Sequence, residues 1–239
     1  MRRLLLLVTS AAIPIAVGCA SYTQLAPGER QAIERELTGS ASTKFLRLSY
    51  YVTPFFGDAS KKLLTHVPPE EVRMLNHPNG EPVNPGPVQK VLPAGTRVRI
   101  IKVEFPTSWV VTERVLYTPR SQPWIYLEVA GEPRTHPFIL VLRSKIQSHD
   151  EFLAEVGRFL SDRDPKPLLE GFTEPVREAI RKKTAVTEMP AEALEMAWGY
   201  PELKRIDAPN RKEMWVYPGR RRIAYLVDGR LERTEAGTQ

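Results

Sequence analysis

The stretch MPAEALEMAWGYP, residues 189–201, predicts a short helix that stops just before a β-sheet. Proline and glutamate near its beginning are typical of the first turn of a helix, and its small and apolar side chains, Trp198 included, recur on one face. Gly199 suits the position just past a helix end, where a left-handed backbone is favoured, and Pro201 prevents any continuation. We therefore interpret this aromatic stretch as a helix end rather than a ligand platform.

Three short runs after this helix predict a small antiparallel sheet. They are EMWVY (213–217), RRRIAYLV (220–227) and RLERT (230–234). Pro218-Gly219 separates the first two runs, and Asp228-Gly229, a favoured tight-turn pair, separates the last two. The pattern predicts a helix followed by a three-stranded meander.

The order and spacing of these elements resemble the SmpA/OmlA domain over about residues 184–234. That family includes a small lipoprotein of the outer-membrane β-barrel assembly machinery. The resemblance implies helices packed on a three-stranded sheet that act through protein contacts, in some members with acidic phospholipid nearby. Here the module follows a large extra region and occurs once. The matching residues are Met189, Leu194, Gly199, Pro201, Trp215, Tyr217 and Gly229.

The resemblance implies a protein-binding surface on this module. We expect contacts with envelope proteins at the aromatic strand, at the basic hairpin and at the tyrosine that follows the helix. These candidates are Trp215, Tyr217, Arg220, Arg221, Arg222 and Tyr200.

The middle of the chain is rich in predicted strands. The runs 96–104, 109–117, 124–130 and 138–143 are β-branched or aromatic, and each separator carries proline, as in a meander or small barrel. The lead-in LPAGTRVRI (92–100) is similar to the first strand of bacterial SH3-like domains. In cell envelopes such barrels often bind wall peptides, so the aromatic residues either line a groove or form the barrel core. These residues are Trp109, Tyr117, Trp124 and Tyr126.

Helices and strands alternate elsewhere, which predicts an α+β fold: a central antiparallel β-rich small barrel plus a C-terminal helix-and-meander module. Helices are expected at 29–37, at 68–75 and within 149–182, with a strand at 46–52. We divide the chain into a signal peptide (1–18), a lipidated tether (19–27), an N-terminal helix with an SH3-like barrel (28–147), and a helical linker with the SmpA/OmlA-like module (148–239).

The first residues have the three parts of a secretory signal. Arg2 and Arg3 give a positive start, residues 4–18 are apolar, and small residues precede Cys19. Pro14 interrupts the apolar run, which is shorter than the roughly 20 residues of a spanning helix. We therefore predict a cleaved signal peptide rather than a transmembrane anchor.

Cys19 is the single cysteine of the chain and lies where the apolar run ends. The sequence AVGC (16–19) resembles the bacterial lipobox, which implies cleavage after Gly18, diacylglycerol on the thiol and an acyl chain on the new amine. The alternative is a buried cysteine in an unprocessed chain. Ala20, rather than aspartate, favours export to the outer membrane. We expect no other cofactor and no disulfide.

Composition and motifs narrow the function further. The chain of 239 residues is 26% charged with a net charge of +6, which falls to +4 without the leader, and its basic residues are dispersed. Dispersed charge argues against nucleic-acid binding. No histidine pair, nucleophile elbow or phosphate loop occurs, so neither a metal site nor a catalytic site is expected. The sequence predicts a non-catalytic envelope scaffold or accessory subunit; the alternative is a peptidoglycan-binding module.

Overall fold

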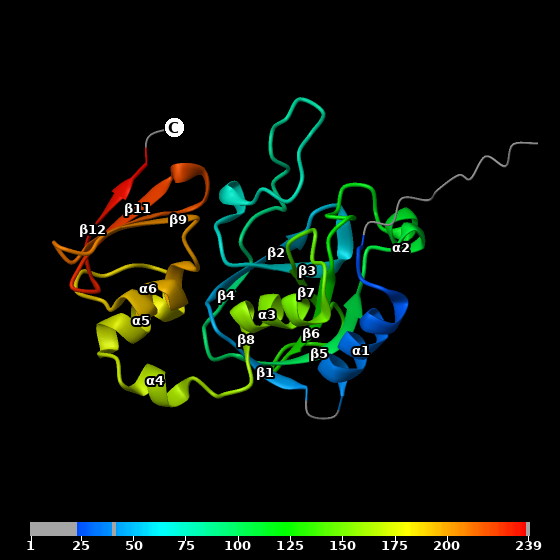
Figure 1. Cartoon of the computed structure of the whole chain (residues 1–239), viewed down its shortest axis with the longest axis horizontal. Helices are drawn as coiled ribbons and strands as arrows, with labels where there is room; N and C mark the ends of the chain where they lie inside the picture. The colour runs from blue at the N-terminus through cyan, green and yellow to red at the C-terminus, as the bar shows by residue number, and fades with distance from the viewer. Residues whose placement is uncertain (1–22, 40–41, 238–239) are drawn as a thin grey trace, which may run out of the picture.

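A computed structural model describes residues 23–39 and 42–237, which form two units side by side (Figure 1). The larger unit is built on an eight-stranded sheet and the smaller on a four-stranded sheet. Both units combine helices with strands, so the predicted α+β class is confirmed. None of the helices in these residues is long and apolar enough to span a bilayer.

The larger sheet has the strand order β4-β2-β3-β7-β6-β5-β1-β8. Every neighbouring pair is antiparallel except β3 and β7, which are parallel. Its strands are β1 (Thr43–Leu46), β2 (Tyr50–Phe55), β3 (Asp58–Thr65), β4 (Lys90–Leu92), β5 (Arg97–Glu104), β6 (Trp124–Val129), β7 (Phe138–Val141) and β8 (Leu160–Ser161).

This sheet stays open at β4 and β8 and does not close into a barrel, so the SH3-like barrel prediction is wrong. The predicted strand 109–117 is instead helix α2 (Ser108–Glu113) and a loop. The side chain of Thr107 caps α2 by accepting a hydrogen bond from the Val110 amide. Without that strand, β5 pairs on one side with β6 and on the other with β1, which carries the sheet on to β8.

Two other local predictions also differ. The predicted helix 68–75 is a single 3₁₀ turn, η1 (Pro69–Glu71), because the chain leaves helical geometry at Val72. The predicted strand 46–52 is divided between the end of β1 and the start of β2 by a bend.

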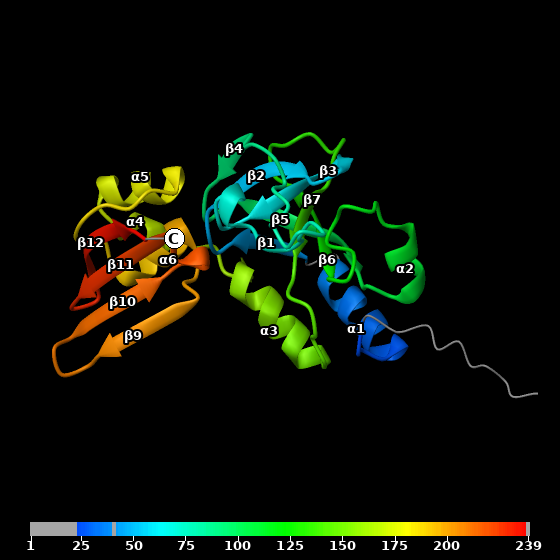
Figure 2. The ribbon, with the colours of Figure 1, turned by 90° about the horizontal axis from the view of Figure 1, so that it is seen from above.

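Helices α1 (Pro27–Thr38) and α3 (His149–Phe159) lie against the larger sheet (Figure 2). Both begin with acidic first turns, and Ser148 caps α3 by accepting from the Glu151 amide. Their apolar faces, including Ile33 and Phe152, share one core with the strands. The predicted division at residue 148 assigns α3 to the C-terminal module, whereas α3 packs within the N-terminal unit.

The smaller unit packs helices against one face of a sheet with the order β12-β11-β10-β9. It has four strands rather than the predicted three, because the charged run Leu203–Asp207 adds β9 as a fully exposed edge strand. Its elements are α4 (Lys166–Glu170), α5 (Glu174–Lys182), α6 (Ala191–Trp198), β9 (Leu203–Asp207), β10 (Lys212–Val216), η2 (Pro218–Arg220), β11 (Arg222–Val227) and β12 (Arg230–Ala236).

Gly199 ends α6 as its sequence position predicted, and the backbone explains why glycine is needed. Its φ is +87° and its ψ is −170°, an extended region that is open almost only to glycine and differs from the expected left-handed helical one. A Cβ at this position would lie 2.5 Å from Cδ2 of His66, a residue of the larger unit. The stretch MPAEALEMAWGYP therefore both ends a helix and brings the two units into contact.

Candidate functional site

The segment between β5 and β6, residues 105–123, is an ordered loop that we call the α2 loop. The guanidinium of Arg114 is buried inside it and donates to the carboxylate and the backbone carbonyl of Glu104. The same group donates to the carbonyls of Arg120 and Gln122 at 2.6 and 2.7 Å. It also lies 3.6 Å from the ring centroid of Trp124. Arg114 therefore holds both ends of the loop against the sheet.

A cleft of about 530 Å³ lies between this loop, helix α1 and the ends of strands β3, β5 and β6. Trp124 and Tyr126 contribute two adjacent aromatic rings to its wall, with centroids 6.4 Å apart. Nζ of Lys102 lies 5.0 Å from the Tyr126 centroid. Aromatic walls combined with polar groups are typical of sites that bind organic ligands.

Ion pairs hold two acidic groups of the cleft, Glu104 and Asp58, in their charged state. Burial by itself raises the pKa of Glu104, but hydrogen bonds and charges from Lys102 and Arg114 outweigh it and lower that pKa. Burial likewise opposes the lowered pKa of Asp58, which bonds from Lys61 and Ser60 bring about. A carboxylate with a lowered pKa is a poor proton donor near neutral pH. This arrangement suits charge recognition better than general acid catalysis.

The rim of the cleft also carries charges that make no ion pair within the described part of the chain. They are the guanidinium of Arg30 and the carboxylates of Glu34, both on α1, and of Glu113 at the end of α2. In total the cleft is lined by four cationic and four acidic side chains. This balance favours a ligand with both charges, such as a peptide segment, over a polyanion.

The four aromatic residues predicted to form a groove divide into two pairs. Trp124 and Tyr126 are buried and line the cleft. Trp109 and Tyr117 lie in the α2 loop, do not line the cleft, and are 72% and 58% exposed. Neither alternative, a common groove or a common core, describes all four residues.

On the C-terminal module, most of the residues predicted to bind a partner are buried or make contacts within the protein. Trp215 and Tyr217 are buried against α5 and α6. Arg222 makes a double hydrogen-bonded ion pair with Glu71 of the larger unit, at 3.0 and 2.9 Å. This placement argues against their role as a contact surface.

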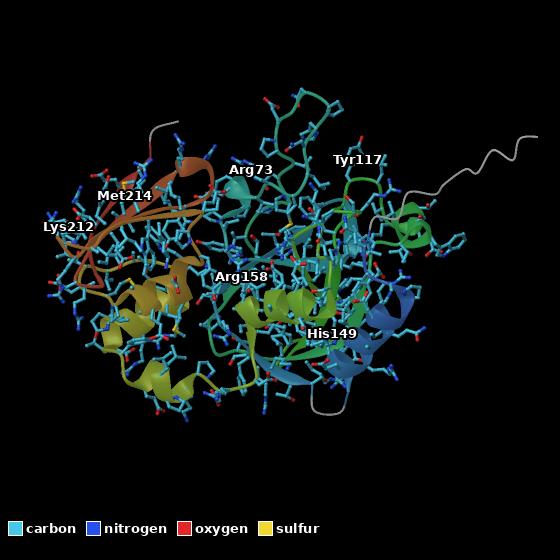
Figure 3. The ribbon with its side chains drawn as sticks, viewed as in Figure 1. Arg73, Tyr117, His149, Arg158, Lys212 and Met214 are labelled. Carbon is cyan, nitrogen blue, oxygen red and sulfur yellow. The ribbon has the colours of Figure 1, made fainter. Side chains whose placement is uncertain are left out.

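The remaining three candidates are less enclosed. Arg220 is exposed in η2, and Arg221 beside it is partly buried. The hydroxyl of Tyr200 donates to the Arg158 carbonyl at 2.8 Å, and its ring packs against the core of the larger unit. The role of Tyr200, which the sequence left open, is therefore to join α6 to α3. Figure 3 shows Arg158 at this junction.

Cys19 lies outside the described residues, so its predicted lipidation has no structural counterpart here. In residues 23–39 and 42–237 no three histidine, cysteine or acidic side chains are grouped as metal ligands would be. No family model matches the chain, and no curated protein or solved structure matches it either. The SmpA/OmlA resemblance therefore stays a prediction from the residues alone.

Sequence reasoning named Trp124 and Tyr126 as candidate groove residues but missed the charged residues that build the cleft. Glu104 and Arg114 are ten positions apart across a strand end and a short helix, a spacing with no recognisable pattern. Arg30 and Glu34 looked like ordinary charges on the exposed face of a helix. The proline-flanked 105–119 stretch, FPTSWVVTERVLYTP, was the available signal, because a strand with that many turn residues is improbable.

Proposed function

We propose that this protein is a lipid-anchored component of the bacterial cell envelope, on the periplasmic face of the outer membrane. It acts without catalysis, as a scaffold or accessory subunit that binds a segment of a partner protein. The observation that carries this proposal is the cleft beside the α2 loop, with its aromatic wall and balanced charges. The signal peptide and lipobox support the location.

A peptide fits the chemistry of the cleft in three ways. Apolar side chains would pack on Val110 and Val115, which line the cleft and are not buried, beside the rings of Trp124 and Tyr126. A basic side chain would meet Glu34 or Glu113, and an acidic one would meet Arg30. The ion pairs around Glu104 keep the wall rigid, which lowers the entropic cost of binding.

Site-specific photo-crosslinking in cells tests this proposal. A crosslinker at Gln31, which is exposed on α1 and lines the cleft, should capture one or a few envelope proteins. The matched control is Glu232, an exposed position on β12 of the other unit. Equal capture at both positions, or none at Gln31, would count against a peptide-binding cleft.

The anchor has a separate test. The substitution Cys19→Ser removes the thiol that would carry diacylglycerol, so the protein should leave the membrane fraction and become soluble in the periplasm. Membrane attachment that persists in this variant would show that the lipobox is not used.

A second candidate function is binding of peptidoglycan stem peptides, and the same balance of charges favours it. Such peptides carry both amines and carboxylates and would meet Glu34, Glu113 and Arg30 at the rim. Purified protein should then sediment with isolated peptidoglycan, and Glu34→Gln with Glu113→Gln should reduce the bound fraction severalfold. Absence of sedimentation would favour the protein-binding function.

A further inference from the structure

The α2 loop presents large apolar side chains to solvent. Of the nine large apolar side chains that are exposed in the described residues, four lie within 109–117. Trp109 is 72% exposed, Leu116 65% and Tyr117 58%, and Val115 is the fourth. Such a concentration on an otherwise polar surface is typical of a place where another surface binds.

This exposure is not the result of a loosely attached loop. Arg114 ties the loop to Glu104, Arg120 and Gln122, as described above. The guanidinium of Arg120 in turn donates to the Val111 carbonyl, which brings the end of the loop back onto α2. The exposed side chains therefore stand on a backbone that several charge-assisted hydrogen bonds hold in place.

The two sides of α2 differ in what they contact. Val110 and Glu113, three positions apart on the helix, line the cleft. Val115 also lines it, but Trp109, Leu116 and Tyr117 do not. We call these three residues the outer surface of the α2 loop. It is a separate feature from the proposed peptide site.

The outer surface lies at the end of the molecule where the chain enters the fold. Figures 1 and 2 both show α2 beside α1, at the end opposite to β9–β12. Figure 3 shows Tyr117 toward this end, whereas Lys212 and Met214 lie at the other. Helix α1 begins at Pro27, only eight positions after Cys19. An extended chain of that length spans at most about 28 Å.

We propose that the outer surface of the α2 loop rests on the lipid bilayer, with Trp109, Leu116 and Tyr117 entering the headgroup region. This inference rests on the proposed anchor at Cys19, whose short tether keeps α1 and α2 near the membrane. Tryptophan and tyrosine favour the membrane–water interface, because their rings are apolar and their N–H and O–H groups can stay hydrated. Together, the anchor and the loop would set the orientation of the cleft.

The charge of the loop indicates which lipids it would contact. Glu113, Arg114 and Arg120 are the charged residues of the α2 loop; Arg114 is buried, and the Arg120 guanidinium donates to the Val111 carbonyl. Contact with the bilayer would therefore depend on apolar insertion rather than on attraction to anionic headgroups. The affinity for phosphatidylcholine vesicles should therefore change less than about twofold when phosphatidylglycerol or salt is added.

Vesicle flotation measures how strongly the loop binds a bilayer when the lipid anchor is absent. The processed chain, residues 19–239 with Cys19→Ser, should bind phosphatidylcholine vesicles weakly. Adding Trp109→Ser and Leu116→Ser should lower the partition coefficient about tenfold or more, because each substitution removes a large apolar group. The matched control is Ile206→Ser, which removes a 66% exposed apolar side chain from β9 at the far end. Equal loss in the control and the loop variant would overturn the proposal.

Quenching of tryptophan fluorescence measures whether the loop contacts lipid when the anchor is in place. In vesicles that contain brominated lipid, fluorescence of the lipidated protein should be quenched, and Trp109→Phe should abolish most of the quenching. Trp124 and Trp215 are buried, and Trp198 is partly buried against the core of the smaller unit, so these three should contribute little. Quenching that is absent, or unchanged by Trp109→Phe, would overturn the proposal even if Cys19 is lipidated.

A loop that binds vesicles while Cys19→Ser leaves the distribution in cells unchanged would instead refute only the anchor. Capture of a protein through a crosslinker at Trp109, with no quenching, would assign the surface to a protein partner.

Discussion

The junction between the two units buries polar groups, whereas the α2 loop exposes apolar ones. At the junction, Lys183 is buried, and its ammonium donates to the carbonyls of Ser49 and Ala197 at 2.7 and 2.6 Å. At the loop, Trp109 is large, apolar and mostly exposed. A buried ammonium costs free energy unless other groups compensate it. Two carbonyls accept from Lys183, but burial and then the charge of Arg222 lower its pKa well below the usual range. Trp109 is left largely uncovered by the described residues. The loop is therefore the better candidate for a functional role, and the junction for a stabilising one.

Several other polar groups at the junction are also paired, whereas the buried hydroxyls of Tyr50 and Tyr217 have no hydrogen-bond partner in the described residues. The hydroxyl of Ser49 donates to the Ile180 carbonyl and accepts from the Ala94 amide. Arg222 and Glu71 form the double ion pair described above. A junction in which each of these buried polar groups has a specific partner holds the two units in one arrangement.

The largest effect that we expect comes from Lys183. Lys183→Met keeps an apolar stem of similar length but leaves the Ser49 and Ala197 carbonyls without their donor, so the free energy of unfolding should fall by about 3 kcal/mol. Urea denaturation followed by circular dichroism measures this change. The neighbouring Lys182→Met, which loses only an exposed pair with Glu178, should cost less than about 0.5 kcal/mol. Equal stability of the Lys183 variant and the wild type would show that the junction does not depend on this lysine.

The second largest effect should come from Gly199, where backbone strain and a clash at the junction add. Gly199→Ala places a methyl group 2.5 Å from Cδ2 of His66 in addition to forcing a positive φ, and should cost about 2–3 kcal/mol. Gly131 has a similar φ of +82° but open space around it, so Gly131→Ala should cost only about 1 kcal/mol. Thermal unfolding of both variants compares the two losses of stability. Similar losses would mean that the clash with His66 adds nothing to the backbone strain.

A third effect depends on pH, because the ring of His66 lies at the junction between Tyr50 and Phe159. Burial, and then the positive charges of Lys183, Arg158 and Arg222, lower its pKa from 6.5 to about 3. Between those values the unfolded chain binds a proton that the folded chain does not. Stability from this group is therefore complete above pH 6.5 and is lost as the pH falls toward 3.

The size of this effect should be about 1 kcal/mol per pH unit below about pH 6. Because carboxylates also titrate in this range, the measurement is the difference in slope between the wild type and His66→Gln. His77→Gln, at an exposed position, is the matched control. A His66→Gln slope equal to the wild-type slope would contradict the buried neutral imidazole.

The smallest effect on stability should come from the α2 loop itself. Trp109→Ser removes a side chain that contacts little of the protein, so it should change the free energy of unfolding by less than about 0.5 kcal/mol. The same variant should lose membrane contact. A large loss of stability would place Trp109 with the structural residues and remove the main argument for a binding surface.

Local patterns in the sequence were sufficient for several elements. Periodic apolar residues and first-turn acids predicted α1, α3, α5 and α6, and Asp228-Gly229 predicted the last hairpin. The same rules failed where tertiary contacts decide. The run 109–117 has the composition of a strand but is a helix and loop, because Arg114 finds its partners ten positions away and on the far side of the loop. β9 was missed because its five exposed residues lack the alternation of a half-buried strand.

The sequence alone determined the mixed α+β class, the candidate signal and lipobox, and the end of α6 at Gly199, since each depends on residues close together in the chain. Only the tertiary structure decided that the larger sheet is open, that Trp215 and Tyr217 are buried, and that Arg30, Glu104 and Trp124 share one cleft. These facts depend on strands and loops far apart in sequence, where the free energy of burial and of paired charges outweighs local preference.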